Sequence, residues 1–235
     1  MKILITAGPD QCATSAARRP VPMKILITAG PTREPIDPVR YLTNRSSGKM
    51  GYAIAEAAAH AGHRVLLISG PTSLDVPEGI DFLPVETAAE MFQAVANYLP
   101  KMDAAIFAAA VADYTPASPA TQKIKKGGNT LSLDLVKTKD ILGSARGEFG
   151  FTGFLVGFAA ETENFEANAR IKLEKKGCDL VIANDVSRSD IGFDSHENEA
   201  LLVFPDRTEL FAKAPKHDLA IHLVSLLGDH TRHRV

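Results

Sequence analysis

The sequence predicts an α/β fold: a Rossmann-like, doubly wound, mostly parallel sheet with a small β-hairpin or flap added to it. Short, almost continuous apolar runs alternate with stretches that have the spacing of amphipathic helices. Such runs are typical of parallel strands that are covered on both faces of the sheet. The chain has 235 residues, of which 45% are hydrophobic, and this is enough to bury a large core.

The expected elements alternate in order along the chain. A capping box formed by Thr87 and Glu90 marks one helix start, and Gly62 and Gly177 mark two helix ends. Two short strands flank the turn residues 205–207 and predict a hairpin. The expected strands are 24–28, 64–69, 81–85, 104–109, 154–159, 179–183, 200–204 and 208–211, and the expected helices are 46–61, 87–98, 164–176 and 215–227.

The chain begins with a duplication, because residues 1–9 and 23–31 both read MKILITAGP. Only the second copy leads into a strand, a loop and a helix. We therefore expect residues 1–22 to be an N-terminal extension without a chemical role, with an extra edge strand as the alternative. Residues 23–235 are expected to form the domain that carries the chemistry.

Composition excludes several classes of partner. The formal net charge of −2 gives no overall field that would attract nucleic acid or an anionic membrane. The two cysteines, Cys12 and Cys178, lack metal-ligand spacing and are typical of a reducing compartment. Neither a membrane-spanning run nor a signal peptide is expected, so we predict a cytoplasmic protein.

The loop after the first strand is the strongest candidate for a phosphate site. It reads NRSSGKMG over residues 44–51, and glycines with hydroxyls at a helix start suit a phosphate or carboxylate. It matches neither the dinucleotide fingerprint nor the Walker A pattern, and a plain tight turn is the alternative. The second strand ends in Ser69 and Gly70 without an acidic residue, which weakens a nicotinamide-binding interpretation.

Later loops place further polar residues at the carboxyl ends of the strands, where ligands bind in such folds. Asp113 follows small residues that admit a flat base, and it either binds a ligand or caps a turn. Lys123 opens the run KIKK beside two glycines, which is either a cationic arm for phosphate or solvated surface. Lys172 and Lys176 are four residues apart on one helix face, and Asn184 follows the next strand.

These segments together resemble the phosphopantothenate–cysteine ligase family. The resemblance runs from Met23 to the C-terminus and implies a ligase that joins 4′-phosphopantothenate to cysteine through an acyl-cytidylate, in coenzyme A biosynthesis. It further implies CTP as substrate, Mg²⁺ and a homodimer. The matching segments are ITAGPTREPIDPVRYLTNRSSGKMG, AAAVADYTP, KIKK, VGFAAETEN, DLVIANDVS and GFDSHENEALLVF.

A flavin-dependent decarboxylase domain often precedes this ligase, but only the short extension does so here, so we expect a stand-alone ligase without flavin. The residues do not decide between CTP and ATP. Two other classes stay open, a nicotinamide-dependent reductase and a nucleotide-binding protein without catalytic activity.

The resemblance also implies roles for individual residues. Asn44 is expected to act in converting the intermediate to product, by donating a hydrogen bond to the acyl oxygen, and Lys123 in forming the intermediate. We expect Ser46, Ser47 and Gly48 to hold the substrate phosphate. The family loop usually has a proline where this chain has Lys139, which puts the geometry of the loop in question. The expected nucleotide contacts are Ala108, Ala109, Asp113, Lys123, Asp140, Ile141, Leu142, Phe158, Lys172 and Lys176.

Overall fold

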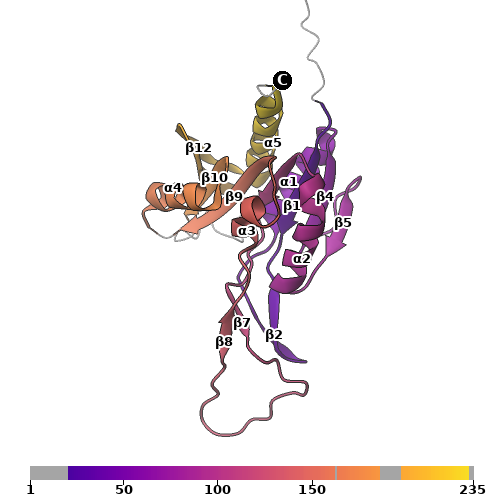
Figure 1. The fold of residues 1–235 in the computed structure, drawn as a ribbon, viewed down its shortest axis with the longest axis vertical. Coiled ribbons are helices and arrows are strands. Elements are labelled where there is room, and N and C mark those ends of the chain that lie inside the picture. The colour runs from indigo at the N-terminus through magenta and orange to yellow at the C-terminus, as the bar shows by residue number, and fades with distance from the viewer. Residues whose placement is uncertain (1–20, 162, 186–196, 233–235) are drawn as a thin grey trace, which may run out of the picture.

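The computed structural model describes residues 21–161, 163–185 and 197–232. Its centre is an eight-stranded sheet with the order β12-β11-β10-β9-β6-β1-β4-β5 (Figure 1). The six strands from β10 to β5 are parallel, and β11 and β12 form an antiparallel hairpin at one edge. The strands are β1 (Lys24–Ala29), β4 (Arg64–Ser69), β5 (Asp81–Pro84), β6 (Ala104–Phe107), β9 (Phe154–Glu161), β10 (Leu180–Asp185), β11 (Glu197–Val203) and β12 (Thr208–Pro215).

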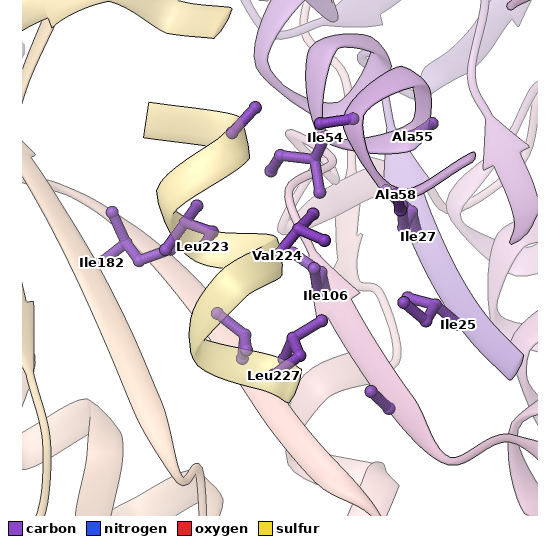
Figure 2. Close-up of a cluster of buried hydrophobic side chains, with 14 of the residues drawn as sticks. Ile25, Ile27, Ile54, Ala55, Ala58, Ile106, Ile182, Leu223, Val224 and Leu227 are labelled. Carbon is purple, nitrogen blue, oxygen red and sulfur yellow. The ribbon is translucent and has the colours of Figure 1, made fainter. Parts of the chain in front are cut away.

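Helices cover both faces of the sheet. α1 (Lys49–His60) and α5 (Lys216–Arg232) pack on one face, and α2 (Ala88–Tyr98), α3 (Ile141–Gly147) and α4 (Phe165–Lys176) pack on the other. Alternate residues of β1 pack into the hydrophobic layers on the two faces of the sheet, because successive side chains of a strand point to opposite faces. In Figure 2, helix α5 lies over Ile106 and Ile182, beside α1.

The strand order reverses beside β1. The chain passes from β1 to β4 on one side and later returns to β6 on the other side. In doubly wound sheets a ligand-binding crevice opens at this point, outside the carboxyl ends of the strands. The fold class predicted from the sequence is therefore confirmed, and it places the candidate site beyond β1 and β6.

Some boundaries differ from the sequence prediction. The helix expected from residue 46 begins at Lys49, because Gly48 has a left-handed backbone with φ 77°. Thr87 does form the predicted capping box with Glu90, whereas Asn164 precedes α4 with φ 50° and makes no side-chain cap. The duplicated residues 1–9 lie outside the described residues.

Short elements escaped prediction. They are α3, the 3₁₀ turn η1 (Leu99–Lys101), and two small hairpins, β2 (Arg33–Asp37) with β3 (Arg40–Thr43) and β7 (Tyr114–Pro116) with β8 (Leu135–Lys137). Strands of three to five residues are too short for a period of two to stand out. Among the described helices, none combines the length and the apolar character needed to cross a membrane.

Candidate active site

Two adjoining cavities open at the reversal point of the sheet. We name them the α3 cavity, of about 550 Å³, and the α1 cavity, of about 490 Å³. Both are within the range of roughly 300–1,000 Å³ that is typical of small-molecule sites. They share a wall, so ligands in the two cavities would meet there. This wall is formed by Ala109, Val111, Asp113, Phe158 and Lys172.

The α3 cavity combines an apolar side with a basic side. Met91, Phe107 and Ile141 are among its apolar lining residues. Four lysines face two aspartates on the polar side, which gives a net positive lining suited to a polyphosphate. These charged residues are Lys137, Lys139, Lys172, Lys176, Asp113 and Asp140.

Local contacts fix the α4 lysines in place. Lys172 Nζ donates to the Phe158 carbonyl oxygen at 2.6 Å, and Lys176 forms an ion pair with Asp140. Burial raises the pKa of Asp140, but hydrogen bonds from Lys176 and from the Gly143 N–H lower it by more, so this carboxyl stays below its ordinary value. The two cations are therefore positioned before any ligand binds.

The loop with the unusual Lys139 keeps its helix cap. Asp140 precedes α3, and its carboxylate accepts the Gly143 N–H at 2.8 Å, which is regular N-cap geometry. The Lys139 ammonium lies 4.4 Å from the centroid of the Phe92 ring, within cation–π range. The side chain at position 139 is thus accommodated by packing against α2.

The α1 cavity surrounds the start of helix α1. Its wall includes the continuous segment from Asn44 to Gly51. The first internal hydrogen bond of α1 runs from the Tyr52 N–H to the Gly48 oxygen at 3.2 Å, so the preceding N–H groups belong to the helix end that attracts anions. A side chain at Gly51 would place its Cβ 2.5 Å from the Cβ of Ala29. Glycine therefore allows α1 to begin directly against β1.

Asn44 is held by the loop that follows β6. Its Nδ2 donates to the carbonyl oxygens of Ala110 and Val111, both at 3.1 Å. One amide nitrogen carries two hydrogens, so these bonds use its full donor capacity. Because Asn44 lines the α1 cavity, its Oδ1 is the polar atom left for a ligand.

The predicted Lys123 lies elsewhere. It is exposed and lines neither cavity. Both backbone polar groups of its neighbour Ile124 are hydrogen-bonded. The Ile124 N–H donates to Asp37 Oδ2 at 3.1 Å, and the Ile124 oxygen accepts from Arg40 Nη2 at 2.9 Å. The hydrogen bond from Arg40 holds the pKa of Asp37 far below its usual range.

We call the two small hairpins, with the loop between β7 and β8, the arm (residues 33–43 and 114–137). The arm projects from the carboxyl edge of the sheet (Figure 1). Besides the Ile124 contacts, the Ala120 N–H donates to the Ile36 oxygen at 2.9 Å and ties the two hairpins together.

All predicted site residues except Lys123 line at least one cavity. Asn44, Ser46, Ser47, Gly48 and Ala108 line the α1 cavity, Asp140, Ile141, Leu142 and Lys176 line the α3 cavity, and Ala109, Asp113, Phe158 and Lys172 line both. Arg45 and Lys49 lie in the candidate segment 44–51, whereas sequence reasoning missed Thr28, Lys137, Asn198 and Lys216. Lys137 is next to the recognised loop at 138–141 and could have been found, but Asn198 and Lys216 carry no local signal.

A doubly wound sheet with basic cavities at its reversal point is typical of proteins that bind phosphorylated small molecules. Comparison with known families is more specific. The model of the DNA/pantothenate metabolism flavoprotein C-terminal domain matches residues 22–230, and the chain belongs to this family. The resemblance predicted from the sequence is confirmed.

Relatives carry names from coenzyme A biosynthesis. The coenzyme A biosynthesis bifunctional protein CoaBC of Bacillus subtilis is 50% identical over 74% of this chain and 43% of its own length. The protein of the same name from Vibrio cholerae is 44% identical over 97% of this chain and 52% of its own length. The chain thus spans about half the length of these relatives.

Solved structures agree with this assignment. The crystal structure of the C-terminal domain of coenzyme A biosynthesis bifunctional protein CoaBC matches with a TM-score of 0.75 and 38% identity, over 89% of this chain and 96% of that domain. The match therefore covers nearly the whole of that domain.

Proposed function

We propose that the chain joins 4′-phosphopantothenate to L-cysteine at the expense of CTP, as a ligase of coenzyme A biosynthesis. The observation that carries this proposal is the shared wall. Lys172 and Asp113 line both cavities, so a nucleotide in one cavity and an acid in the other would meet at a fixed cation. The family membership supports the substrate class.

The nucleotide fits the α3 cavity. The small side chain of Ala109 and the apolar wall admit a base, while Lys172 and Lys176 are placed to neutralise phosphate oxygens. Among the described residues, no three or more His, Cys, Asp or Glu side chains are grouped so that they could hold a metal ion. A Mg²⁺ ion would therefore be held mainly by phosphate oxygens and water, with Asp113 as the acidic neighbour, and it would supply further charge neutralisation.

The acid fits the α1 cavity, with its phosphate toward the segment Ser46–Gly48. Its carboxylate oxygen attacks the α-phosphorus of CTP, the bond to the β-phosphate breaks, and pyrophosphate leaves. The product is an acyl-cytidylate. Such transfer requires positioning and charge neutralisation more than covalent help from the protein, and Lys172 lies where the two reactants meet.

The second half-reaction needs an oriented amine. The cysteine nitrogen attacks the acyl carbon, loses a proton, and CMP leaves with the electrons of the acyl–oxygen bond. From the sequence we expected Asn44 to donate a hydrogen bond to the acyl oxygen. The two amide hydrogens of Asn44 are already bound to the carbonyl oxygens of Ala110 and Val111. We therefore propose instead that Asn44 Oδ1 accepts a hydrogen bond from the attacking amine, which orients the nitrogen lone pair toward the acyl carbon.

Lys123 is assigned to the site of a second copy of the chain. The arm that carries it exposes large apolar side chains, which are typical of an unpartnered interface. We propose that these residues pack in a homodimer and bring Lys123 to the partner's α-phosphate. The exposed residues are Val39, Tyr41, Tyr114, Leu131, Leu133, Leu135 and Val136.

The nicotinamide alternative finds no support at the second parallel strand. β4 ends at Ser69, whose hydroxyl donates to the Gly70 oxygen at 2.7 Å. Gly70 lies against the Pro31 backbone so closely that a Cβ would be 1.8 Å from its oxygen. Ser69 and Gly70 at this strand end carry no carboxylate that could bind the ribose hydroxyls.

A pyrophosphate-release assay tests the proposal. CTP and 4′-phosphopantothenate together should release pyrophosphate, and the amide product should appear only when cysteine is added. ATP in place of CTP measures the nucleotide preference. Pyrophosphate release that needs no phosphopantothenate, or a melting temperature raised by NADPH and not by CTP, would overturn the assignment.

A further inference from the structure

The α1 cavity extends from the start of α1 to a pair of asparagines that the proposed reaction does not yet use, Asn184 of β10 and Asn198 of β11. Asn184 lies two positions after Ile182, which belongs to the hydrophobic layer under α1 and α5. Asn198 lies two positions before Ala200 of the same layer. Side chains two apart on a strand share a face, so the apolar packing on this face ends in two amide groups at the cavity.

Asn198 gives the first sign that a ligand binds at this pair. Its side chain belongs to a residue that is only 2% exposed, and its Oδ1 is buried without a hydrogen-bond partner in the part of the chain that the structure describes. A buried acceptor without a donor is unfavourable. Because Asn198 lines the cavity, a donor group of a ligand is what would satisfy this oxygen.

Asn184 complements this acceptor with a donor. Its Oδ1 accepts a hydrogen bond from Asn198 Nδ2 at 3.4 Å, which orients the amide. Among the described residues, no group accepts a hydrogen bond from Asn184 Nδ2, although an amide nitrogen carries two hydrogens. The pair therefore offers a neighbouring acceptor and donor to the same cavity.

The strand order separates this pair from the start of α1. The wall shared by the two cavities is built largely from β9 and from the loop after β6, and these strands lie between β10 and β1 in the sheet. Under the proposed function, the acid extends from α1 to this wall and meets the nucleotide there. The third reactant, cysteine, can therefore approach the acyl carbon from the side of β10 and β11.

The distance along the sheet suits an amino acid. Asn44 is bonded to the loop after β6, and β10 lies two strand positions away, or roughly 10 Å. A small amino acid with a hydrogen bond of about 2.9 Å at each end has a similar length. Its amine would then lie at Asn44, while its carboxylate and side chain reach the asparagine pair.

We propose that Asn184 and Asn198 form the cysteine subsite and select the amino acid. Asn184 Nδ2 donates to the cysteine carboxylate, and Asn198 Oδ1 accepts the thiol S–H. This inference rests on the proposed function and gives its third substrate a place. A thiol is a weak donor, but the oxygen that it satisfies is buried, so an analogue without the S–H leaves that oxygen unpaired.

The test compares cysteine with two analogues on the complete wild-type chain. L-2-aminobutyrate replaces the S–H by a methyl group, and cysteamine lacks the carboxylate. With saturating CTP and 4′-phosphopantothenate, kcat/KM for amide formation is measured for each amine. We expect both analogues to be about tenfold or more poorer than cysteine, the scale of one unsatisfied or lost hydrogen bond.

Two variants assign each preference to one residue. Asn198→Leu removes the acceptor, so the preference for cysteine over 2-aminobutyrate should vanish while that over cysteamine remains. Asn184→Asp keeps an acceptor for Asn198 but loses the donor, so only the preference over cysteamine should vanish.

The ratios of kcat/KM separate recognition from a structural role. A purely structural asparagine would slow the reaction of all three amines by the same factor and leave their ratios intact. Asn97→Leu replaces an asparagine of α2 that lines neither cavity, and it should keep both preferences. If Asn198→Leu fails to fold, the wild-type comparison and Asn184→Asp still decide.

Three results would overturn the subsite. They are a wild type that uses 2-aminobutyrate and cysteamine as well as cysteine, unchanged preferences in the folded variants, and variants whose main defect in calorimetry is weaker phosphopantothenate binding, which would assign the pair to the acid. Pyrophosphate release by the wild type, from CTP and phosphopantothenate without cysteine, tests the proposed function separately. If it occurs and the preferences do not, the subsite fails alone; if it does not occur, the proposed function fails first.

Discussion

The two adjoining cavities, together called the cleft, and the arm carry the candidate chemistry in different ways. In the cleft, buried strands fix the backbone, and internal contacts hold the polar side chains. Lys172 donates to the Phe158 oxygen, Lys176 pairs with Asp140, and Asn44 donates to the loop after β6. In the arm, Lys123 is exposed on a long connection between two three-residue strands. Asp37 and Arg40 hold this connection at Ile124, and the Ala120 N–H holds it at the Ile36 oxygen.

Under the proposed function, this difference means that one chain pre-forms the binding site but does not by itself complete the catalytic one. Lys172 and Lys176 of the cleft are held by internal contacts before any ligand binds, and such preorganisation is a large part of electrostatic catalysis. Lys123 would have to be delivered by another contact. The proposed function therefore divides the work: the cleft would bind the substrates, and the arm would supply the cation that activates the α-phosphate.

Replacing Lys123 by Gln should have the largest effect. If the arm supplies the cation for the α-phosphate, pyrophosphate release falls by about a hundred- to a thousandfold, the scale for losing one transition-state contact. Nucleotide binding, measured by calorimetry, should change little because the cleft lysines remain. Lys126→Gln, on the same connection, serves as the control, and near-normal release by Lys123→Gln would remove the arm from the reaction.

Replacing Asn44 by Asp should separate the two half-reactions. A carboxylate cannot donate to Ala110 and Val111, so the side chain loses its orientation toward the amine. Pyrophosphate should still be released, while amide formation falls by about a hundredfold and the acyl-cytidylate accumulates, as followed by mass spectrometry. Equal slowing of both steps would contradict a role that is confined to the second step.

Replacing Asp37 by Asn should loosen the arm without removing its lysine. We expect kcat to fall by about tenfold, less than for Lys123→Gln, because the arm visits its working position less often. Amide hydrogen exchange at Ile124 should accelerate. Asp134→Asn, on the same arm, is the control, and unchanged exchange at Ile124 would show that Asp37 does not anchor it.

The depressed pKa of Asp37 gives this anchor a pH dependence. A group whose folded pKa lies below its unfolded value of about 3.9 contributes stability above that value and loses it as the pH falls further. The Ile124 amide of the wild type should therefore be protected from hydrogen exchange at neutral pH. As the pH falls below about 4, its exchange rate, relative to that of an unprotected amide, should approach that of Asp37→Asn.

Replacing Lys139 by Pro should have the smallest effect. It removes a cation–π contact of about 0.5–1 kcal/mol with Phe92, and the fixed backbone of proline restores a similar amount where it fits. The Lys139 N–H donates no hydrogen bond to any described residue. The melting temperature should therefore stay close to the wild-type value, and the affinity for CTP should fall only slightly, because three other lysines line the α3 cavity. A complete loss of CTP binding would show that the loop depends on Lys139.

Sequence patterns predicted the cleft far better than the arm. The strands around Ile27 and Ile106 are continuous apolar runs, and the residues that follow them must meet at one sheet edge, which is why Asn44, Asp113 and Lys172 could be grouped in advance. Asn198 and Lys216 could not, because their place depends on a hairpin that returns the chain to that edge. The anchor between Asp37 and Ile124 joins distant segments and has no local signature.

The most direct test of the division between cleft and arm is to mix two inactive variants, Lys123→Gln and Asn44→Asp, and to measure product formation. If each arm serves the other subunit, a mixed dimer contains one site with both native residues, and random mixing should restore about a quarter of wild-type activity. If Lys123 acts within its own chain, no site in the mixed dimer is intact. A mixture as inactive as its two components would contradict the account.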